Sequence, residues 1–224
     1  RILATSSQGY MLVYNQADES DKVFFPTMSR VFKILDDSGE SQQDDFELKI
    51  NPFRFEFKSD DEKTRTNLEI KFKRDRGLNE PIEKKIKSEN KNISDDELKS
   101  MVNKELLKIS PKDTFKKLVK QYNISTAYSL NQQRRFMIVK DALKMQSFSG
   151  YKPVTVASNI KKDTAFKFLQ MLNELPGIDV TTQPIRSYPN GDLGSNFIGY
   201  ISKISSNYEK YTEKGYDVNS DYVG

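Results

Sequence analysis

The amino-acid sequence predicts an α+β fold, in which an extended, strand-rich stalk carries a nested helical head. Apolar and polar residues alternate at residues 46–57, and residues 178–188 read as extended, as expected of half-buried strands. Between these segments, apolar residues recur three and four positions apart, which is the spacing of one helical face. We therefore expect a strand-rich region of residues 1–57 and 151–224, and a nested, charged, mainly helical segment of residues 58–150.

The first third of the chain begins with a strand and a helix. Residues 9–15 are apolar and aromatic, which favours a strand. Thr27 is the expected N-cap of a helix that ends at Gly39. The apolar face of this helix would consist of Met28, Val31, Phe32 and Leu35.

Three segments with alternating apolar and polar residues follow this helix. Residues 46–50 and 53–57 alternate at period two, and each predicts a half-buried strand. Residues 68–72, Leu-Glu-Ile-Lys-Phe, show the same alternation. We therefore predict a strand there as well.

Capping signals predict helices in the centre of the chain. Residues 94–97, Ser-Asp-Asp-Glu, form a capping-box pattern, and Leu98, Met101, Val102 and Leu106 would lie on one face. Ser110 followed by Pro111 indicates a cap and a first-turn proline. A further helix is expected over residues 131–145.

The last third predicts another strand and another helix. Residues 153–158 favour a strand, and Asp163 is the expected cap of a helix that runs to about Glu174. Apolar positions of this helix include Phe166, Leu169 and Leu172. Residues 175–177, Leu-Pro-Gly, form a sharp stop before the extended segment, and a turn and a short helix would follow it.

The residues that the chain lacks exclude several kinds of chemistry. With no Cys and no His, it has no disulfide, thiolate nucleophile, imidazole base or His-ligated metal. Residues 217–221 imitate the start of a calcium loop, but Tyr222 stands where that loop requires Gly. We expect no metal and no cofactor. The longest apolar runs, residues 10–14 and 136–139, are far shorter than the roughly 20 residues of a membrane span.

The positive charge of the chain is concentrated in its centre. Residues 58–120 hold 18 Lys and Arg and 13 Asp and Glu, within a net charge of +4 for the chain. The two signs alternate closely, which is typical of solvated helix faces with ion pairs. A protein-docking surface is the next interpretation. The aromatic residues lie at core spacing and Lys exceeds Arg, so no nucleic-acid partner is expected.

One pattern in the last third is more specific than the others. Residues 175–180 read Leu-Pro-Gly-Ile-Asp-Val, residues 186–191 read Arg-Ser-Tyr-Pro-Asn-Gly, and residues 198–200 read Ile-Gly-Tyr. This order resembles the N-terminal pedestal, often called the dimerisation domain, of class B penicillin-binding proteins, and the elongation type is the closer match. Residues 1–4 resemble the end of the opening motif of that family. The close resemblance covers residues 153–204.

The residues that carry this resemblance have the properties of scaffolding. A proline after a helix stops it, and a glycine there can take a positive φ and reverse the chain. An arginine can hold such a corner through bidentate hydrogen bonds. The expected structural residues are Pro176, Gly177, Arg186, Tyr188, Pro189, Gly191, Gly199 and Tyr200.

We find no pattern that predicts catalysis in this chain. The transpeptidase domain of the family uses S-x-x-K, S-x-N and K-T/S-G motifs, with Ser and Lys one helical turn apart. Formal S-x-x-K matches occur about as often as chance predicts, at Ser88/Lys91, Ser149/Lys152 and Ser158/Lys161. No Lys-Thr-Gly or Lys-Ser-Gly occurs. We therefore expect no catalytic residue here.

The resemblance implies a role in peptidoglycan synthesis and cell shape. A pedestal raises and orients the D,D-transpeptidase domain at the extracytoplasmic face of the bacterial cell membrane. We expect an N-terminal membrane helix before Arg1 and the transpeptidase domain after Gly224. Other implied partners are a membrane glycan polymerase of the shape, elongation, division and sporulation family, a rod-shape scaffold protein and a second copy of the chain. The segment of residues 58–150 would face a partner.

Three other interpretations remain open at this point. The chain would fit a division- or sporulation-type pedestal of the same family. It would also fit an unrelated extracellular interaction module, if the Arg-x-Tyr-Pro match were accidental. The third alternative is a small enzyme that uses only Asp, Glu, Lys, Ser and Tyr.

Overall fold

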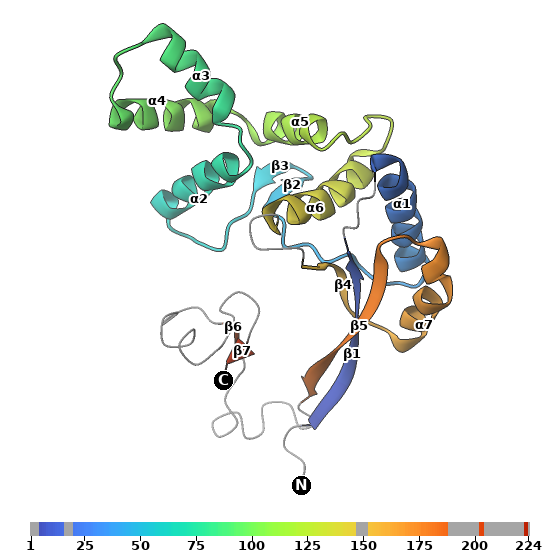
Figure 1. The fold of residues 1–224 in the computed structure, drawn as a ribbon. Coiled ribbons are helices and arrows are strands. Elements are labelled where there is room, and N and C mark those ends of the chain that lie inside the picture. Colours follow the sequence, from blue (N-terminus) through green and yellow to red (C-terminus); the bar gives the residue numbers. More distant parts are fainter. Residues whose placement is uncertain (1–4, 16–19, 147–151, 188–201, 204–221, 224) are drawn as a thin grey trace. The chain divides into compact units, whose positions relative to one another are not determined.

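The computed structural model describes residues 5–15, 20–146, 152–187, 202–203 and 222–223 (Figure 1). The chain divides into two units, one of residues 1–9 with 182–224 and one of residues Tyr10–Thr181. The elements are β1 (Thr5–Tyr14), α1 (Asp21–Asp37), β2 (Leu48–Ile50), β3 (Phe53–Phe55), α2 (Glu62–Asp75), α3 (Glu80–Glu89), α4 (Asp95–Lys108), α5 (Pro111–Gln121), α6 (Leu130–Gln146), β4 (Val154–Ile160), α7 (Lys162–Met171), η1 (Leu172–Glu174), β5 (Ile178–Ser187), β6 (Ser202–Lys203) and β7 (Tyr222–Val223). The predicted α+β class is confirmed.

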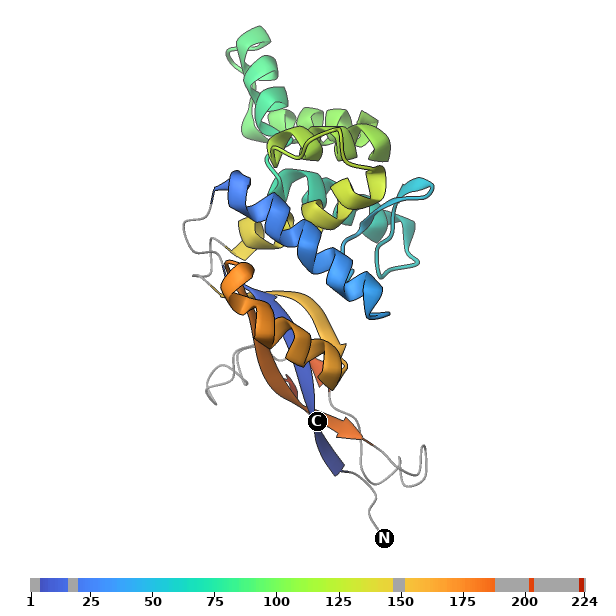
Figure 2. The ribbon, with the colours of Figure 1, turned by 90° about the vertical axis from the view of Figure 1, so that its right-hand side faces the viewer.

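The main sheet is built from strands that are far apart in the sequence. Its order is β4-β1-β5. β1 pairs with β4 in antiparallel orientation, from Tyr10 opposite Ile160 to Tyr14 opposite Val154, with two irregularities in the register. Within the unit of residues Tyr10–Thr181, α7 lies over one face of this sheet (Figure 2). The predicted strands at residues 9–15, 153–158 and 178–188 are thus found close to their expected positions.

The predicted strands of residues 46–57 form a hairpin of their own. β2 and β3 pair in antiparallel orientation, with Leu48 opposite Phe55 and Ile50 opposite Phe53. A cis peptide bond joins Asn51 and Pro52 in the turn. The hairpin packs against α5 and α6 and forms a two-stranded sheet separate from β4-β1-β5.

One large core joins the sheet, the hairpin and most of the helices. Buried side chains from β1, α1, β2, β3, α5, α6, β4 and α7 all contribute to it. Phe136 of α6 lies at its centre, because the rings of four aromatic residues surround it at centroid distances of 4.9–6.4 Å: Phe24, Phe25, Phe32 and Tyr128. Phe72 of α2 belongs to this core as well. The predicted boundary between the helical segment of residues 58–150 and the strand-rich ends therefore stays a prediction.

A second, smaller core holds α2, α3 and α4 together. Its buried members are Ile86, Leu98, Val102 and Leu106. Partly buried isoleucines and a leucine from α2, α3 and the connecting loops pack around them. In the part of the chain that the structure describes, no helix combines the length and the apolar composition needed to cross a bilayer.

Helices with strong local caps lie where the sequence predicts them. Ser94 and Glu97 form the expected capping box at α4, with Ser94 N donating to Glu97 Oε2 at 3.2 Å. Ser110 caps α5, since its Oγ accepts from Asp113 N at 3.1 Å. The helix expected over residues 131–145 is α6. These three predictions are confirmed.

The predicted start of α1 at Thr27 is wrong. The helix begins at Asp21, with Ser20 as N-cap, so Pro26 lies in the second turn. A proline inside a helix costs about 3 kcal/mol, because it removes a hydrogen bond to the preceding turn. Burial of Phe24 and Phe25 contributes about 1.5–3 kcal/mol each and offsets that cost.

The strand predicted for residues 68–72 is also wrong, because these residues belong to α2. Asp61 caps this helix, and its Oδ2 accepts from Thr64 N at 2.7 Å. The buried side of the helix end consists of Phe72, Lys73 and Arg76, which follow helical spacing. Two of these three buried residues are charged, so the buried side of the helix does not appear as an apolar stripe in the sequence. The period-two alternation of residues 68–72 therefore gives the wrong prediction. The short helix α3 was not predicted individually; only Ile86 is buried along it.

The helix predicted after Asp163 is confirmed as α7, but its cap and its buried face differ from the prediction. Lys161 is the N-cap, and Asp163 lies in the first turn. The capping acceptor is Glu40, whose Oε1 accepts from Lys161 N at 2.8 Å. The buried residues of α7 are Thr164, Ala165 and Phe168, whereas Phe166 and Leu169 are exposed.

Candidate functional site

The Leu-Pro-Gly corner joins the end of η1 to the start of β5. Leu175 is buried, and its carbonyl accepts a hydrogen bond from Ile178 N at 3.1 Å. Gly177 has φ +76°, in the left-handed region that its predicted role in the turn requires. The Gly177 carbonyl accepts from Asn15 N at 2.7 Å. This bond ties the corner to the residue that follows β1.

The space beside Gly177 admits no side chain. A Cβ atom at this position would lie 2.7 Å from Tyr14 Cε2 and 2.8 Å from the Asn15 carbonyl oxygen. Both distances are shorter than real Cβ atoms show, and the Asn15 oxygen belongs to the backbone. Glycine is therefore required at this corner for its conformation and also for the close approach of the two chain segments.

The other residues predicted for the structural motif lie at the margin of the described part or beyond it. Arg186 belongs to β5 by its backbone, and its side chain is outside the description. Outside the described residues are Tyr188, Pro189, Gly191, Gly199 and Tyr200, together with the turn and short helix predicted there and the candidate calcium loop at 217–221. The structural role predicted for Arg186, which is to hold a corner of the chain through bidentate hydrogen bonds, stays a prediction.

The two Ser/Lys pairs whose Ser and Lys are both described are not arranged as a catalytic pair. Ser88 lies in the last turn of α3, where its Oγ donates to the Lys85 carbonyl at 2.6 Å, and Lys91 lies beyond the end of that helix. Ser158 lies in β4, and Lys161 is the N-cap of α7. Neither pair shares a helical face, which is the arrangement that an S-x-x-K nucleophile requires. Ser149 lies outside the described residues.

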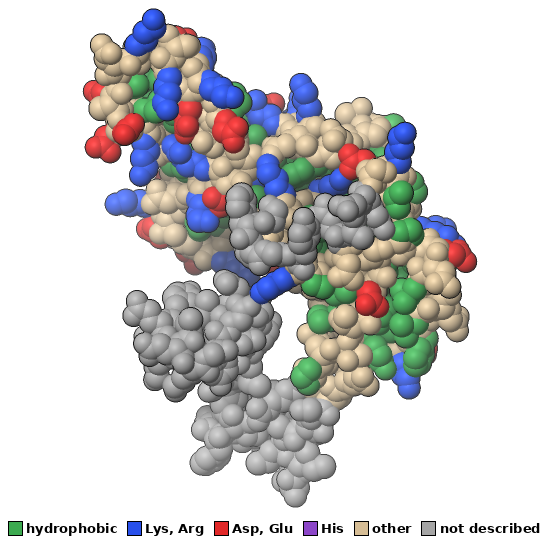
Figure 3. Space-filling model, viewed as in Figure 1, with side chains coloured by type: hydrophobic (Ala, Val, Ile, Leu, Met, Phe, Trp, Pro, Cys, Tyr) green, Lys and Arg blue, Asp and Glu red, His purple; other side chains and the backbone are tan. Residues whose placement is uncertain are grey.

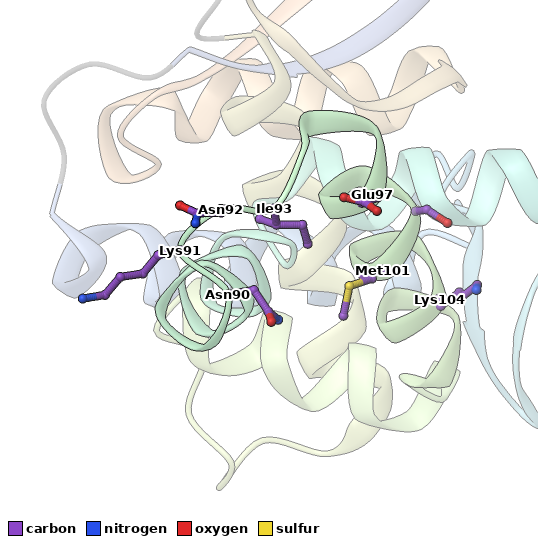
Figure 4. Close-up of a pocket in the computed structure, with 8 residues that line it drawn as sticks. Asn90, Lys91, Asn92, Ile93, Glu97, Met101 and Lys104 are labelled. Atoms are coloured by element: carbon purple, nitrogen blue, oxygen red, sulfur yellow. The ribbon is translucent and has the colours of Figure 1, made fainter.

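Among the described residues, no group of three or more carboxylates is placed to hold a metal ion. A surface pocket lies where the loop after α3 meets α4 (Figure 4). Its lining residues are Asn90, Lys91, Asn92, Ile93, Glu97, Ser100, Met101 and Lys104. Hydrogen bonds from the Ser94 side chain and backbone hold the pKa of Glu97 below its usual value, so this carboxylate is a poor proton donor. Besides Glu97, the pocket therefore offers two amides, two lysines, one hydroxyl and two apolar side chains, without an acid–base pair.

A buried charge cluster joins α2, α5 and α6. Arg76 donates from Nε and Nη2 to the two Asp141 carboxylate oxygens at 2.7 and 2.6 Å. The Tyr122 hydroxyl donates to the same carboxylate at 2.7 Å. Only 7% of Arg76 and 4% of Asp141 is exposed to solvent. The guanidinium also stacks on the Phe72 ring, 3.4 Å from its centroid. The cluster therefore fixes the end of α2 on the main core.

The electrostatics of this cluster are those of a structural unit. Burial, the negative charge of Asp141 and the hydrogen bond to it raise the pKa of the Tyr122 hydroxyl well above its ordinary value. Tyr122 is therefore a neutral hydrogen-bond donor throughout the physiological pH range. Neither Arg76 nor Asp141 is predicted from the sequence, because nothing local distinguishes these two residues from solvated charges.

Lys73 forms a second buried contact between elements, and the sequence analysis missed it too. Its side chain is fully buried. Its ammonium group donates to the Leu106 carbonyl at 2.9 Å, to the Ile109 carbonyl at 2.8 Å and to Glu69. Two of its donors are thus used at the C-terminal end of α4, where a positive charge is favourable, and the third binds Glu69 of α2. Lys73 thereby holds the end of α4 against α2.

Two carboxylates at the edge of the main core are expected to make folding sensitive to acid. Burial alone would raise the pKa of Asp44, but hydrogen bonds from Arg134 and Lys49 and their charges outweigh it, so the pKa lies below its usual value. Hydrogen bonds from Lys140 and Asn123 and the Lys140 charge lower the pKa of Asp21 in the same way, against the effect of burial. Each carboxylate therefore stabilises the fold when it is ionised.

We expect the free energy of unfolding to fall between about pH 5 and pH 3, and the D44N variant to lose less over this range than the native chain. A lowered folded-state pKa gives stability that is complete above the unfolded-state pKa, about 3.9, and is lost as the pH falls through the folded-state value. Urea unfolding at pH 6 and pH 3 measures the difference. The control is D37N, which removes an exposed carboxylate paired with Lys33. Equal acid sensitivity of D44N and the native chain would contradict the expectation.

Comparison with known proteins assigns the chain to a family. A family model described as the penicillin-binding protein dimerisation domain matches residues 1–224. The peptidoglycan D,D-transpeptidase MrdA of Acinetobacter baumannii is 30% identical over 71 residues, which are 32% of this chain and 11% of that protein. The chain thus matches only a small part of that relative.

Two solved structures of penicillin-binding protein 2B from Streptococcus pneumoniae are also similar, and this chain is aligned over 99% of its length with each. The protein from strain 5204 has 13% identity and a TM-score of 0.43, over 30% of its chain. The protein from strain R6 has 15% identity and a TM-score of 0.32, over 29% of its chain. Because the family model matches the whole sequence, the chain belongs to the penicillin-binding protein dimerisation domain family, the pedestal domains of class B penicillin-binding proteins.

Proposed function

We propose that this chain is the non-catalytic pedestal of an elongation-type class B penicillin-binding protein. The observation that carries the proposal is the family match over residues 1–224. The Acinetobacter baumannii relative is named a peptidoglycan D,D-transpeptidase, which supports a parent protein with that activity. The placement of the described Ser/Lys pairs supports a chain that does no chemistry itself.

The mechanism that we propose is geometric. The pedestal would raise its C-terminal transpeptidase domain from the extracytoplasmic face of the membrane, where an N-terminal membrane helix anchors it. The glycine corner at Gly177 and the buried cluster of Arg76, Asp141 and Tyr122 supply the stiffness that such a support needs. Partners would be a membrane glycan polymerase of the shape, elongation, division and sporulation family, a rod-shape scaffold protein and a second copy of the chain.

Labelling with a fluorescent β-lactam tests whether the chain is catalytic. We expect the full-length parent protein to be acylated and the 224-residue chain to remain unlabelled at the same concentration. Heat-denatured parent protein serves as the control for nonspecific attachment. Covalent labelling of the chain alone would refute the proposal, since a pedestal has no serine nucleophile with an activating lysine.

Depletion of the encoding gene in the native bacterium tests the elongation assignment. Loss of an elongation-type protein should make rod-shaped cells swell and round. Cells that lengthen without dividing would instead assign the chain to a division-type pedestal. The resemblance of the Leu-Pro-Gly and Gly-Tyr elements at residues 175–177 and 199–200 favours the first outcome.

Partner docking by residues 58–150 needs a test that leaves the core intact. A deletion within this segment that includes α2 would remove Phe72 and Arg76 from the main core and would unfold more than a docking surface. Surface substitutions on exposed helix faces avoid this problem. Co-purification of the full-length protein with its glycan polymerase partner is the measurement, and unchanged co-purification across all exposed faces of the segment would refute the docking role.

A further inference from the structure

Helix α5 presents a positively charged face to solvent. Its buried side consists of Thr114, Phe115, Leu118 and Val119, which pack into the main core. Its exposed side carries four lysines, Lys112, Lys116, Lys117 and Lys120, which we name the α5 lysine face. Figure 3 shows Lys and Arg side chains projecting from the region where α5 lies in Figure 1. The helix buries one side completely and exposes almost only positive charge on the other.

The charges of the α5 lysine face are not neutralised within the described part of the chain. None of the four lysines forms an ion pair there, whereas lysines of α2 and α4 do, as in Lys71–Asp75 and Lys108–Glu105. The one acidic residue of α5, Asp113, accepts a hydrogen bond from Ser110 Oγ at 2.6 Å in the N-terminal cap. The alternating charge of α2 and α4 is therefore absent from α5.

The carboxylate that directly follows β3 and the one on α6 are engaged elsewhere, although both elements pack against α5. Glu56, at the end of β3, pairs with Arg54, and Asp141 of α6 pairs with Arg76. Like charges four residues apart on a helix destabilise it by a few tenths of a kcal/mol per pair. Repulsion within the α5 lysine face thus destabilises the fold slightly, and no ion pair among the described residues offsets this repulsion. A partner with negative charge would remove this cost.

The spacing of the lysines indicates the shape of that partner. Lys112, Lys116 and Lys120 follow at steps of four residues, which places them about 6 Å apart along one side of the helix. Carboxylates at steps of four residues on a second helix have the same spacing. Arginine, which recognises phosphate through a planar fork, is absent from α5, and lysine acts as a compact point charge.

We infer that the α5 lysine face docks an acidic helix of a partner protein, with Glu or Asp residues repeated every four positions. The inference rests on the proposed docking role of residues 58–150 and names its surface and the chemistry of its ligand. The contact would be electrostatic and would weaken as salt screens it. The aliphatic parts of the lysine side chains would pack against the partner helix, and their ammonium groups would form ion pairs with its carboxylates.

Two fluorescent alanine-rich peptides test the inference on the 224-residue chain. Both are about 20 residues long, so that they are helical in water. One has three glutamates at steps of four residues, and the other has the same composition with the glutamates distributed around the helix. Fluorescence anisotropy at low salt is the measurement. We expect the patterned peptide to bind more tightly than its isomer, and K112Q/K116Q/K120Q to weaken that binding about tenfold.

The matched control removes three exposed lysines from α3 in K84Q/K85Q/K87Q, where glutamates lie among the lysines. This variant should bind the patterned peptide within about twofold of the native chain. Equal weakening by both variants, or equal binding of both peptides, would mean general charge attraction and would overturn the inference. Both variants should stay folded, since only exposed side chains change, and K112Q/K116Q/K120Q should need a slightly higher urea concentration to unfold because it relieves the like-charge repulsion.

Competition separates this partner from other anions. If phosphatidylglycerol vesicles or inorganic polyphosphate bind through the same lysines and the patterned peptide does not, the ligand is a phosphate surface and the inference is wrong. The proposed function is tested independently by co-purification of the full-length protein with its polymerase. Co-purification that survives K112Q/K116Q/K120Q while other surface variants abolish it would overturn only the assignment to α5.

Discussion

Replacing Asp141 with alanine is expected to lower the free energy of unfolding by about 3–5 kcal/mol. The substitution leaves the Arg76 guanidinium buried against Phe72 without its anion, and it removes the acceptor of the Tyr122 hydroxyl. A buried charge without a partner costs far more than the pair contributes when it is complete. Urea unfolding followed by circular dichroism measures the loss.

Two further variants determine where this free energy comes from. Y122F removes one hydrogen bond and should cost only about 1 kcal/mol. The double variant R76M/D141L replaces both charges with apolar side chains and should regain most of the loss, because no unpaired charge stays buried. A D141A variant that unfolds within about 1 kcal/mol of the native chain would contradict the role assigned to the cluster.

The second large effect is expected at the Leu-Pro-Gly corner. G177A should lower the free energy of unfolding by about 2–4 kcal/mol, which combines backbone strain at positive φ with a steric clash. The new Cβ would lie within 3 Å of the Tyr14 ring and of the Asn15 carbonyl oxygen. Since that oxygen is part of the backbone, the corner cannot relax by turning a flexible side chain. Chemical unfolding at neutral pH measures this loss as well.

Gly39 is the matched control for this prediction. It has φ +65°, close to that of Gly177, but a Cβ there would meet only Lys161 Nζ at 3.8 Å. G39A should therefore cost only the strain of the left-handed conformation, about 1 kcal/mol. If G39A and G177A cost the same, steric exclusion at the corner plays no part. The difference between the two variants isolates the contribution of the close approach.

Features that depend on near neighbours in the sequence could be predicted. The caps at Ser94 and Ser110 and the stop at residues 175–177 use groups within three or four residues of each other, so a short window contains the whole interaction. The glycine at Gly177 is recognisable for the same reason. Its clash with Tyr14 is not, because that contact depends on how β1 lies in the fold.

Features that depend on distant partners could not be predicted. Arg76 and Asp141 are separated by 65 positions, and Lys73 meets carbonyls at Leu106 and Ile109, so each looks like an ordinary surface charge in the sequence. Residues 68–72 of α2 were predicted as a strand for a similar reason. A helix whose buried side includes a lysine and an arginine has no apolar stripe to reveal its period.

The pairing of β1 with β4 has a consequence for how the protein is made. Tyr14 faces Val154, so β1 pairs with a strand that is synthesised 140 residues later. At roughly 5–20 residues per second, this delay lasts roughly 7–28 s. During that time Leu12 and Val13 lack the cover that buries them in the finished domain. We therefore expect this segment of the nascent chain to expose apolar surface until β4 has been synthesised.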